Sequence, residues 1–329
     1  MTDPWAATLL TLPVPLDLLV LALALAIDLL FGEPPARIHP TVLIGKTISA
    51  AERRAPAADA APGAQVAYGV AAAGAIPAAW GALVWAVSAG LRELHPLLYL
   101  VVAAALFKTT FSVRMLAREA KRIGDLLAAG DLAAARRRMP ALVSRETGAL
   151  TASQAAAGAI ESVAENSTDS VVGPLLAFAL FGLPGAVVYR AVNTLDSMIG
   201  YRGRYEYLGK ASARLDDLVN LVPARLAAAL LWCTAALLPS MRAAGAWRVA
   251  WSHRRRTASP NAGWTIGAMA GALGVTLEKP RHYRIGAPAP PPDSRHIHQA
   301  TRALYCASLL ATALAGAALV LAATLGRAA

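Results

Sequence analysis

The sequence predicts an all-α integral membrane protein, a polytopic helical bundle with four to six helices that cross the bilayer. Of its 329 residues, 57% are hydrophobic and only 16% are charged, whereas soluble domains carry about 25% charged residues. The mean hydropathy is +0.48, and several apolar runs approach the roughly 20 residues that span a bilayer. We therefore treat residues 1–329 as one membrane domain.

Six apolar runs are candidate membrane segments. They are 14–31, 66–91, 94–111, 171–189, 219–238 and 303–325. The first run has no Lys or Arg before it and no small-residue cleavage site after it, which predicts a retained helix and not a signal peptide. Two runs are interrupted: 171–189 by two Gly/Pro pairs, and 219–238 by Pro223 and Arg225. These interruptions predict broken or re-entrant helices.

The cations predict which loops face the cytosol. Loops 32–63, 108–170 and 239–302 hold four, nine and ten of the 31 Lys and Arg residues. By the positive-inside rule these loops are cytosolic, with the helical part of the middle one at 112–170. We therefore expect a multi-pass protein of the inner cell membrane whose active site faces the cytoplasm. The side of loop 191–218 depends on whether 171–189 crosses, and we favour re-entrance.

An acidic helix face precedes the fourth run. Glu161, Glu165 and Asp169 are spaced four residues apart and share one face, with Asn166 on the neighbouring stripe. Like charges at this spacing repel, so a buried face needs a cation. Mg²⁺ held by one or two carboxylates and by substrate phosphates is the natural candidate. A solvated acidic face is the alternative.

A second polar cluster follows the fourth run. It comprises Asn193, Asp196, Tyr201, Arg202, Lys210, Arg214, Asp216 and Asp217. Lys210 and Arg214 share a helix face, which suits a phosphate or a carboxylate. An internal salt bridge between Arg214 and Asp217 is the alternative.

Three weaker signals lie elsewhere. Arg225 is an ionisable residue inside an apolar run, which is a functional candidate unless it snorkels to the interface. His39 follows Asp28 and Glu33 where the first helix ends, and Asn261 and Trp264 open a helix of small residues. No Walker A segment, dinucleotide fingerprint or nucleophile elbow is present, and the net charge of +11 does not by itself indicate nucleic acid.

Four stretches in order resemble the CbiB family of cobalamin biosynthesis, called CobD in the aerobic pathway. They are DLLFGEPPARIHPTVLIGKTI at 28–48, AIESVAENSTDSVVGPLLAFALFGLPGAVVYRAVNTLDSMIGYR at 159–202, GKASARLDDLVNLVPARLAA at 209–228 and SPNAGWTIGAMAGALGV at 259–275. The resemblance spans about residues 16–325. Gly32-Glu33-Pro34-Pro35 departs from the Gly-Asp-Pro of many members, which leaves the role of Glu33 open.

This resemblance implies adenosylcobinamide-phosphate synthase, a carbon–nitrogen ligase. It would join the free carboxylate of adenosylcobyric acid, a corrinoid, to the amine of (R)-1-amino-2-propanol phosphate or a related amino alcohol, with ATP and Mg²⁺. The expected partners are the lipid bilayer and other late enzymes of the cobalamin pathway. Nucleic acid is not expected as a partner.

The implied chemistry assigns tasks to the candidate residues. Glu161, Glu165 and Asp169 would hold Mg²⁺ and nucleotide phosphates, with Asn193 and Asp196 opposite. Lys210 and Arg214 would hold the aminopropanol phosphate, and Asp216 or Asp217 would accept the amine proton. Asn261 and Trp264 would contact the corrinoid. The full set of expected catalytic and substrate-binding residues is Glu165, Asp196, Asp216, Asp217, Asn166, Asn193, Tyr201, Arg202, Lys210, Arg214, Arg225, Asn261, Trp264 and His39.

Rival functions predict other patterns. A UbiA-type membrane prenyltransferase also holds Mg²⁺-diphosphate on acidic clusters, but its Asn-x-x-x-Asp-x-x-x-Asp spacing is missing. A solute transporter binding an anion at Arg225 should show inverted repeats, and the two halves show none. A purely structural membrane subunit would leave the juxtamembrane carboxylates without a task.

Overall fold

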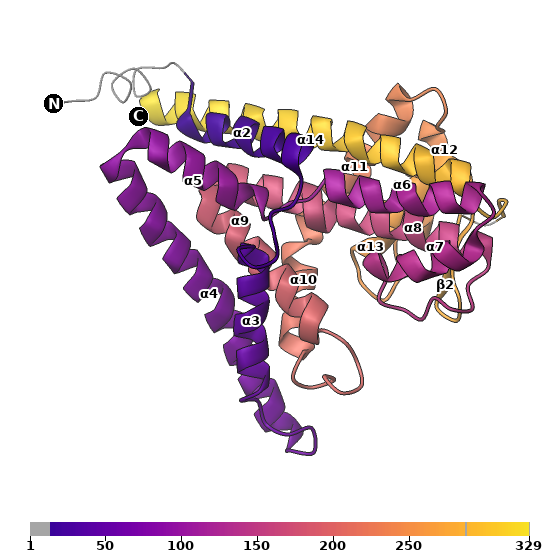
Figure 1. Cartoon of the computed structure of the whole chain (residues 1–329), viewed down its shortest axis with the longest axis horizontal. Helices are drawn as coiled ribbons and strands as arrows, with labels where there is room; N and C mark the ends of the chain where they lie inside the picture. The colour runs from indigo at the N-terminus through magenta and orange to yellow at the C-terminus, as the bar shows by residue number, and fades with distance from the viewer. Residues whose placement is uncertain (1–13, 287, 329) are drawn as a thin grey trace. The chain divides into compact units, whose positions relative to one another are not determined.

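The computed structural model describes residues 14–286 and 288–328, and it consists almost entirely of helices (Figure 1). Three helical stretches of the described chain are long and apolar enough to cross a membrane, namely Pro62–Leu94, Ala152–Ile199 and Ser294–Leu325. A bent pair, Lys210–Val219 with Leu221–Leu237, makes a fourth candidate. The predicted helical membrane fold is confirmed.

Each predicted apolar run becomes helical, but three of these helices have only 13 to 17 residues, including α11 (Leu221–Leu237). Helix α2 spans Leu16–Phe31 and α5 spans Pro96–Lys108. At a rise of about 1.5 Å per residue, 16 and 13 residues reach less far than the roughly 30 Å hydrocarbon core. The long helices are α4 (Pro62–Leu94), α9 (Gly173–Ile199) and α14 (Ser294–Ala328).

Both predicted interruptions are present. A π-helical turn, η2 (Thr168–Val172), precedes α9, and Gly182 inside α9 leaves the helical conformation with φ 66° and ψ −164°. That positive φ favours glycine, and Pro184 follows two residues later. The second break lies at Asn220, where α10 (Lys210–Val219) and α11 (Leu221–Leu237) meet at a bend of 48°.

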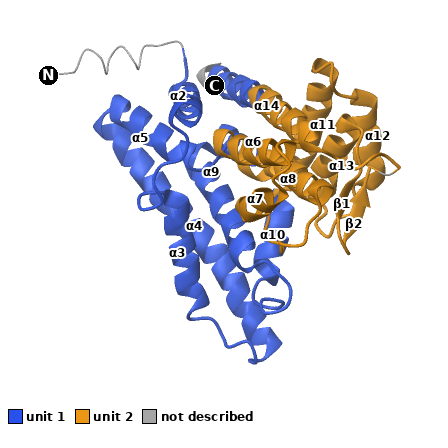
Figure 2. Cartoon of the chain, turned by 45° about the vertical axis from the view of Figure 1, so that its right-hand side comes forward, with its two compact units in different colours: residues 1–112, 173–219, 312–329 blue, residues 113–172, 220–311 orange. Residues whose placement is uncertain are grey.

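The chain divides into two compact units (Figure 2). Unit 1 comprises residues 1–112, 173–219 and 312–329, and unit 2 comprises residues 113–172 and 220–311. In unit 1, α4 packs against α9, α10 and α5, while α3 (Pro40–Glu52) packs against α9.

Polar contacts hold α2 and α5 side by side at both ends. Near the start of each helix, the Tyr99 hydroxyl donates to Asp17 at 2.7 Å, and Arg92 also binds Asp17 at 2.7 Å. At the far end, Lys108 Nζ lies 3.1 Å from Asp28 Oδ1. The two helices therefore run parallel, and their charges are paired with one another within the unit.

Unit 2 is built around α8 (Ala152–Ser167). A capping box of Thr151 and Gln154 starts this helix. Gly158 and the alanine residues from Ala155 onward are buried because α6 (Arg114–Ala128), α13 (Ala262–Leu273) and a strand pack on the helix. Helix α13 is equally rich in small residues, so its backbone at Gly267 and Gly271 approaches α12 (Ala243–His253) closely.

Smaller elements complete unit 2. A turn at Gly130 and Asp131 divides the 112–170 segment between α6 and α7 (Leu132–Arg138). A short 3-10 turn, η1 (Met139–Ala141), extends α7. The antiparallel hairpin of β1 (Leu277–Lys279) and β2 (Tyr283–Ile285) was not predicted. Its strands have three residues each, too few to show an alternating pattern.

Gly69 in α4 gives a test of this packing. A Cβ there would overlap the backbone carbonyl of Leu208, whereas a Cβ at Gly74 in the same helix meets nothing within 4 Å. We expect Gly69→Ala to destabilise the protein by about 1–3 kcal/mol and Gly74→Ala to stabilise it by about 0.5–1 kcal/mol. Thermal unfolding of both variants in detergent measures this, and equal effects would contradict the packing of α4 on the loop before α10.

Candidate functional site

Two of the predicted carboxylates lie together in unit 2, on α8. Glu161 and Glu165 are one helical turn apart, and Glu161 is only 4% exposed. The Arg145 guanidinium lies against this face, with Nη2 3.2 Å from Glu161 Oε2. The buried carboxylate is therefore paired with a cation from the loop before α8, as burial of a charge requires.

The hairpin adds a second cation and a hydroxyl to this cluster. Lys279 and Tyr283 are direct partners across the two strands, so their side chains project from the same face. Lys279 interacts electrostatically with Glu161 and Glu165, and Tyr283 hydrogen-bonds to Glu161. Burial, followed by the two nearby carboxylates, raises the pKa of Tyr283 well above its usual range, so Tyr283 is protonated and can donate.

Asn166 and Asp169 lie at the end of α8 and in the turn that follows. The Asn166 amide donates to the Ser162 carbonyl at 3.0 Å and accepts from Ser170 Oγ at 2.9 Å, which secures the helix where it passes into the π-helical turn. Asp169 lies in that turn. Within residues 14–286 and 288–328, no three His, Cys, Asp or Glu side chains are grouped to enclose a metal ion. The Mg²⁺ ligand set at Glu161, Glu165 and Asp169 stays a prediction.

A second group of carboxylates lies in unit 1. Asp196, near the end of α9, is close enough to Asp216 and Asp217 on α10 for their charges to oppose its own. The Asp196 carboxylate lies against Gly200, where any Cβ would overlap it. Such like charges attract a cation.

The other predicted polar residues of unit 1 lie on α9, on α10 and in the loop between these helices. Lys210 and Arg214 are exposed on α10, and Tyr201 and Arg202 are exposed in the loop before it. Asn193 accepts a hydrogen bond from Arg190 Nη1 at 3.2 Å. The exposed side chains are therefore accessible to a ligand.

Arg225, Asn261 and Trp264, which were predicted from separate signals, come together in unit 2. Arg225 Nη1 donates to Asn261 Oδ1 at 2.9 Å, and its guanidinium carbon lies 5.3 Å from the centre of the Trp264 ring. Trp251 packs edge-on against Trp264 at 5.7 Å and is 52% exposed. Trp251 was not predicted, because its proximity depends on how α12 packs.

A buried ion cluster in unit 1 was only half anticipated. Lys108, 1% exposed, lies 2.6 Å from Glu33 Oε1 and 3.1 Å from Asp28 Oδ1. His39 uses both ring nitrogens structurally: Nε2 lies 3.0 Å from Glu33, and Nδ1 accepts from the Thr41 backbone at the start of α3. The expected substrate role of His39 gains no support from these contacts. Lys108, at the end of an apolar run, was the available signal and was missed.

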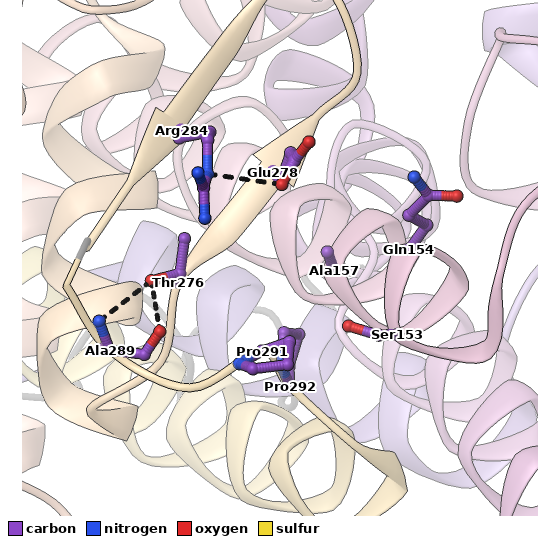
Figure 3. Close-up of a pocket in the computed structure, with 9 residues that line it drawn as sticks. All are labelled: Ser153, Gln154, Ala157, Thr276, Glu278, Arg284, Ala289, Pro291 and Pro292. Atoms are coloured by element: carbon purple, nitrogen blue, oxygen red, sulfur yellow. Dashed lines mark hydrogen bonds and ion pairs between the residues drawn. The ribbon is translucent and has the colours of Figure 1, made fainter.

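A cavity of about 250 Å³ opens beside the first turns of α8 (Figure 3). Its lining includes Ser153, Gln154 and Ala157 of α8. Glu278 and Arg284 pair with each other across the hairpin at 3.3 Å and are 43% and 66% exposed. Ala157 lies one helical turn before Glu161 along α8.

The Glu33 cluster predicts a dependence of stability on pH. Burial opposes ionisation of Glu33, but the hydrogen bond with His39 and the charge of Lys108 outweigh it and lower the pKa of Glu33 from 4.5 to about 2. This stabilisation is therefore complete above about pH 4.5 and is lost as the pH falls toward 2. We expect Glu33→Gln to remove about 2–3 kcal/mol at pH 6 and progressively less below pH 4.

Unfolding in detergent at several pH values measures this difference. The matched control is Glu146→Gln, because Glu146 is exposed. Its unfolding free energy should equal that of the wild type at every pH. A difference in unfolding free energy between wild type and Glu33→Gln that stays constant between pH 6 and pH 2.5 would contradict the proposed stabilisation of Glu33 by the ion cluster.

Comparison with known proteins relates the whole chain to one family. The family model described as CobD/Cbib protein matches residues 21–322. A cobalamin biosynthesis protein CobD of Dehalococcoides mccartyi is 43% identical over 269 residues, covering 82% of this chain and 86% of its own. Proteins of the same name from Geobacter metallireducens and Klebsiella pneumoniae are 41% and 38% identical and cover 88% and 78% of this chain, and 92% and 81% of their own.

No solved structure matches the chain significantly. The family match extends over both units, including the α8 carboxylates, the Asp196 group and the Arg225–Trp264 contact. The motifs that suggested the resemblance all lie within the matched residues. The chain belongs to the CobD/CbiB family.

Proposed function

We propose that this protein acts in cobalamin biosynthesis as adenosylcobinamide-phosphate synthase, an ATP-dependent ligase. The observation that supports the role most strongly is the similarity to CobD proteins along nearly the whole chain. The substrates would be adenosylcobyric acid and (R)-1-amino-2-propanol phosphate or a related amino alcohol phosphate. Membership in this family leaves the prenyltransferase and transporter alternatives without a supporting observation.

The reaction needs activation of a carboxylate. A carboxylate oxygen attacks the γ-phosphorus of ATP, the bond from this phosphorus to the bridging oxygen breaks, and ADP leaves. The amine then attacks the acyl carbon, and inorganic phosphate leaves with that carboxylate oxygen. The substrate's ammonium must lose a proton to a base before its nitrogen can attack, so the site needs cations for the phosphoryl oxygens and a carboxylate for the proton.

The two carboxylate groups suit different tasks. Glu161 and Glu165 already face Arg145 and Lys279, so an added divalent cation would be opposed there. The charges of Asp216 and Asp217 oppose that of Asp196, and Lys210 and Arg214 lie on α10 with Asp216 and Asp217. We assign Mg²⁺ and nucleotide phosphates to the Asp196 group, with one or two carboxylates and phosphate oxygens as ligands.

When bound, Mg²⁺ would neutralise phosphoryl charge. The sequence had predicted Mg²⁺ and nucleotide phosphates at Glu161, Glu165 and Asp169, and the aminopropanol phosphate at Lys210 and Arg214. The present assignment exchanges these two ligands between the two groups of residues. It leaves Glu165, half-buried beside Lys279, as a base for the amine proton in place of Asp216 or Asp217.

The corrinoid is assigned to the aromatic surface around Trp264. A corrin ring presents a broad, largely apolar face edged by amide groups, so it suits stacked or edge-on aromatic rings flanked by hydrogen-bond donors. Trp264, Trp251 and Arg225 supply such a surface. The proposed setting is the inner membrane, with the reaction on the cytoplasmic side where ATP is present, and contact with later pathway enzymes would retain the intermediate.

Amide synthesis by purified protein in detergent tests this proposal. Adenosylcobyric acid, aminopropanol phosphate, ATP and Mg²⁺ should give the amide, identified by its mass. We expect Glu165→Ala and Asp196→Ala each to lower the rate by about 100-fold or more, as loss of an acid–base or charge-stabilising group does.

The matched controls for these variants are Glu146→Ala and Glu206→Ala, which remove exposed carboxylates and should retain full activity. Absence of the amide with wild-type protein would contradict the proposed function. Full activity of both Glu165→Ala and Asp196→Ala would instead contradict the site assignment.

A further inference from the structure

The Glu161–Arg145 pair contains buried hydrogen-bonding atoms that no described part of the chain satisfies. Arg145 donates one hydrogen bond, from Nη2 to Glu161 at 3.2 Å. Within the described residues, Arg145 Nε, Arg145 Nη1 and Glu161 Oε1 are buried and have no hydrogen-bond partner. The Glu161 side chain is only 6% exposed. Leaving such groups unpaired costs about 1–3 kcal/mol each, and more when they are charged.

Two other cations of the described chain, Lys108 and Arg138, make more side-chain contacts than Arg145 does. Lys108 makes three contacts, with Asp28, Glu33 and the Phe111 carbonyl. Arg138 grips Glu119 with two nitrogens, at 2.8 and 2.9 Å. A purely structural role for Arg145 would favour a similar two-point grip, so its free donors indicate that a further group belongs there.

Gly158 leaves room for this arginine. A Cβ at that position would lie 2.6 Å from Arg145 Nη2 and 2.9 Å from Met139 Cε. The guanidinium therefore rests directly against the α8 backbone, one turn before Glu161 along the chain. The absence of a side chain at Gly158 keeps the donors next to the carboxylate.

The surroundings supply both signs of charge and an opening. Lys279 acts on Glu161 and Glu165, and the Tyr283 hydroxyl binds Glu161. Arg145 is 18% exposed along its side chain, and Glu165 is half-buried, so the pair lies at the edge of the interior. Two cations and two carboxylates balance in charge. The unpartnered Arg145 donors suit a phosphate, which carries a charge of about −1.5 to −2 near pH 7. The unpartnered Glu161 oxygen suits an ammonium, so a ligand that carries both groups would satisfy both kinds of atom.

We infer that Arg145 and Glu161 together bind a small zwitterion that carries a primary amine and a phosphate. The phosphate oxygens would accept from Arg145 Nε and Nη1, and the ammonium would donate to Glu161 Oε1. Lys279 and Tyr283 complete the site on the hairpin side. The identification of this ligand as the amino alcohol phosphate rests on the proposed function.

Calorimetric binding to the full chain in detergent tests the inference with four probes. They are (R)-1-amino-2-propanol phosphate, 1-amino-2-propanol, propane-1,2-diol phosphate and inorganic phosphate. Wild-type protein should bind the first at least about tenfold more tightly than the others, because each loses one charge-assisted contact. Arg145→Gln should weaken binding of the zwitterion and the two phosphates, but not of the amine alone. Glu161→Gln should weaken binding of the zwitterion and the amine alone, but not of the phosphates.

Two further variants separate binding from folding. Gly158→Ala keeps every charged group but displaces the flexible end of the Arg145 side chain. It should therefore retain the thermal stability of the protein and weaken binding of the zwitterion about tenfold. Arg145→Lys keeps the charge and loses the fork of donors, so it should bind between wild type and Arg145→Gln. The controls are Gly90→Ala, which meets nothing within 4 Å, and Arg122→Gln, which removes a surface pair with Glu119.

Amide synthesis is measured in parallel so that the two proposals fail separately. Unchanged binding of all four probes in Arg145→Gln and Glu161→Gln overturns the inference, even where wild-type protein makes the amide. The inference is also overturned if wild-type protein makes the amide but binds none of the probes. It is likewise overturned if wild-type protein makes the amide and binds the phosphates as tightly as the zwitterion. Zwitterion binding that depends on Arg145 and Glu161 without any amide product supports the site and overturns the proposed function.

Discussion

Pairing of buried charge is the constraint on which the rest of this structure depends. A chain this apolar has little polar surface, so charges drawn into its interior are stabilised only by opposite charges and hydrogen bonds. Lys108 with Asp28 and Glu33 secures the parallel pair α2 and α5 in unit 1. Arg145 and Lys279 serve the α8 carboxylates in unit 2. In the second group, Arg145 Nε, Arg145 Nη1 and Glu161 Oε1 have no hydrogen-bond partner within the described residues, and this indicates a binding site.

The broken helices and the candidate residues are connected in sequence. Asn166 and Asp169 lie where α8 passes into the π-helical turn, and Asp216 and Asp217 lie just before the bend at Asn220. Helix breaks free backbone groups that must be satisfied by protein or by water-lined space. Polar side chains therefore concentrate beside them, as Asn166 does by binding Ser162 and Ser170.

Much of the fold was predictable because its signals are local. The apolar runs predicted helices, and the glycine and proline pairs in 171–189 predicted a break. The structure has this break at Gly182. The spacing of Glu161 and Glu165 correctly placed both on one helix face. What sequence reasoning missed depends on contacts between distant residues: Glu33 meets Lys108 across 75 positions, and Lys279 reaches the α8 carboxylates from a hairpin too short to recognise. The shorter α2 and α5 follow from Pro15 and Pro96, which set where these helices begin.

The central claim is that the hydrogen-bonding atoms of Arg145 and Glu161 without a partner in the described chain bind one zwitterionic substrate. A cryo-electron microscopy map of the full chain in lipid nanodiscs with saturating aminopropanol phosphate tests it most directly. The claim predicts ligand density that joins Arg145 Nε and Nη1 to Glu161 Oε1, with the phosphate on the arginine side. Well-ordered ligand density elsewhere, with no ligand contact to Arg145 or Glu161, would contradict it.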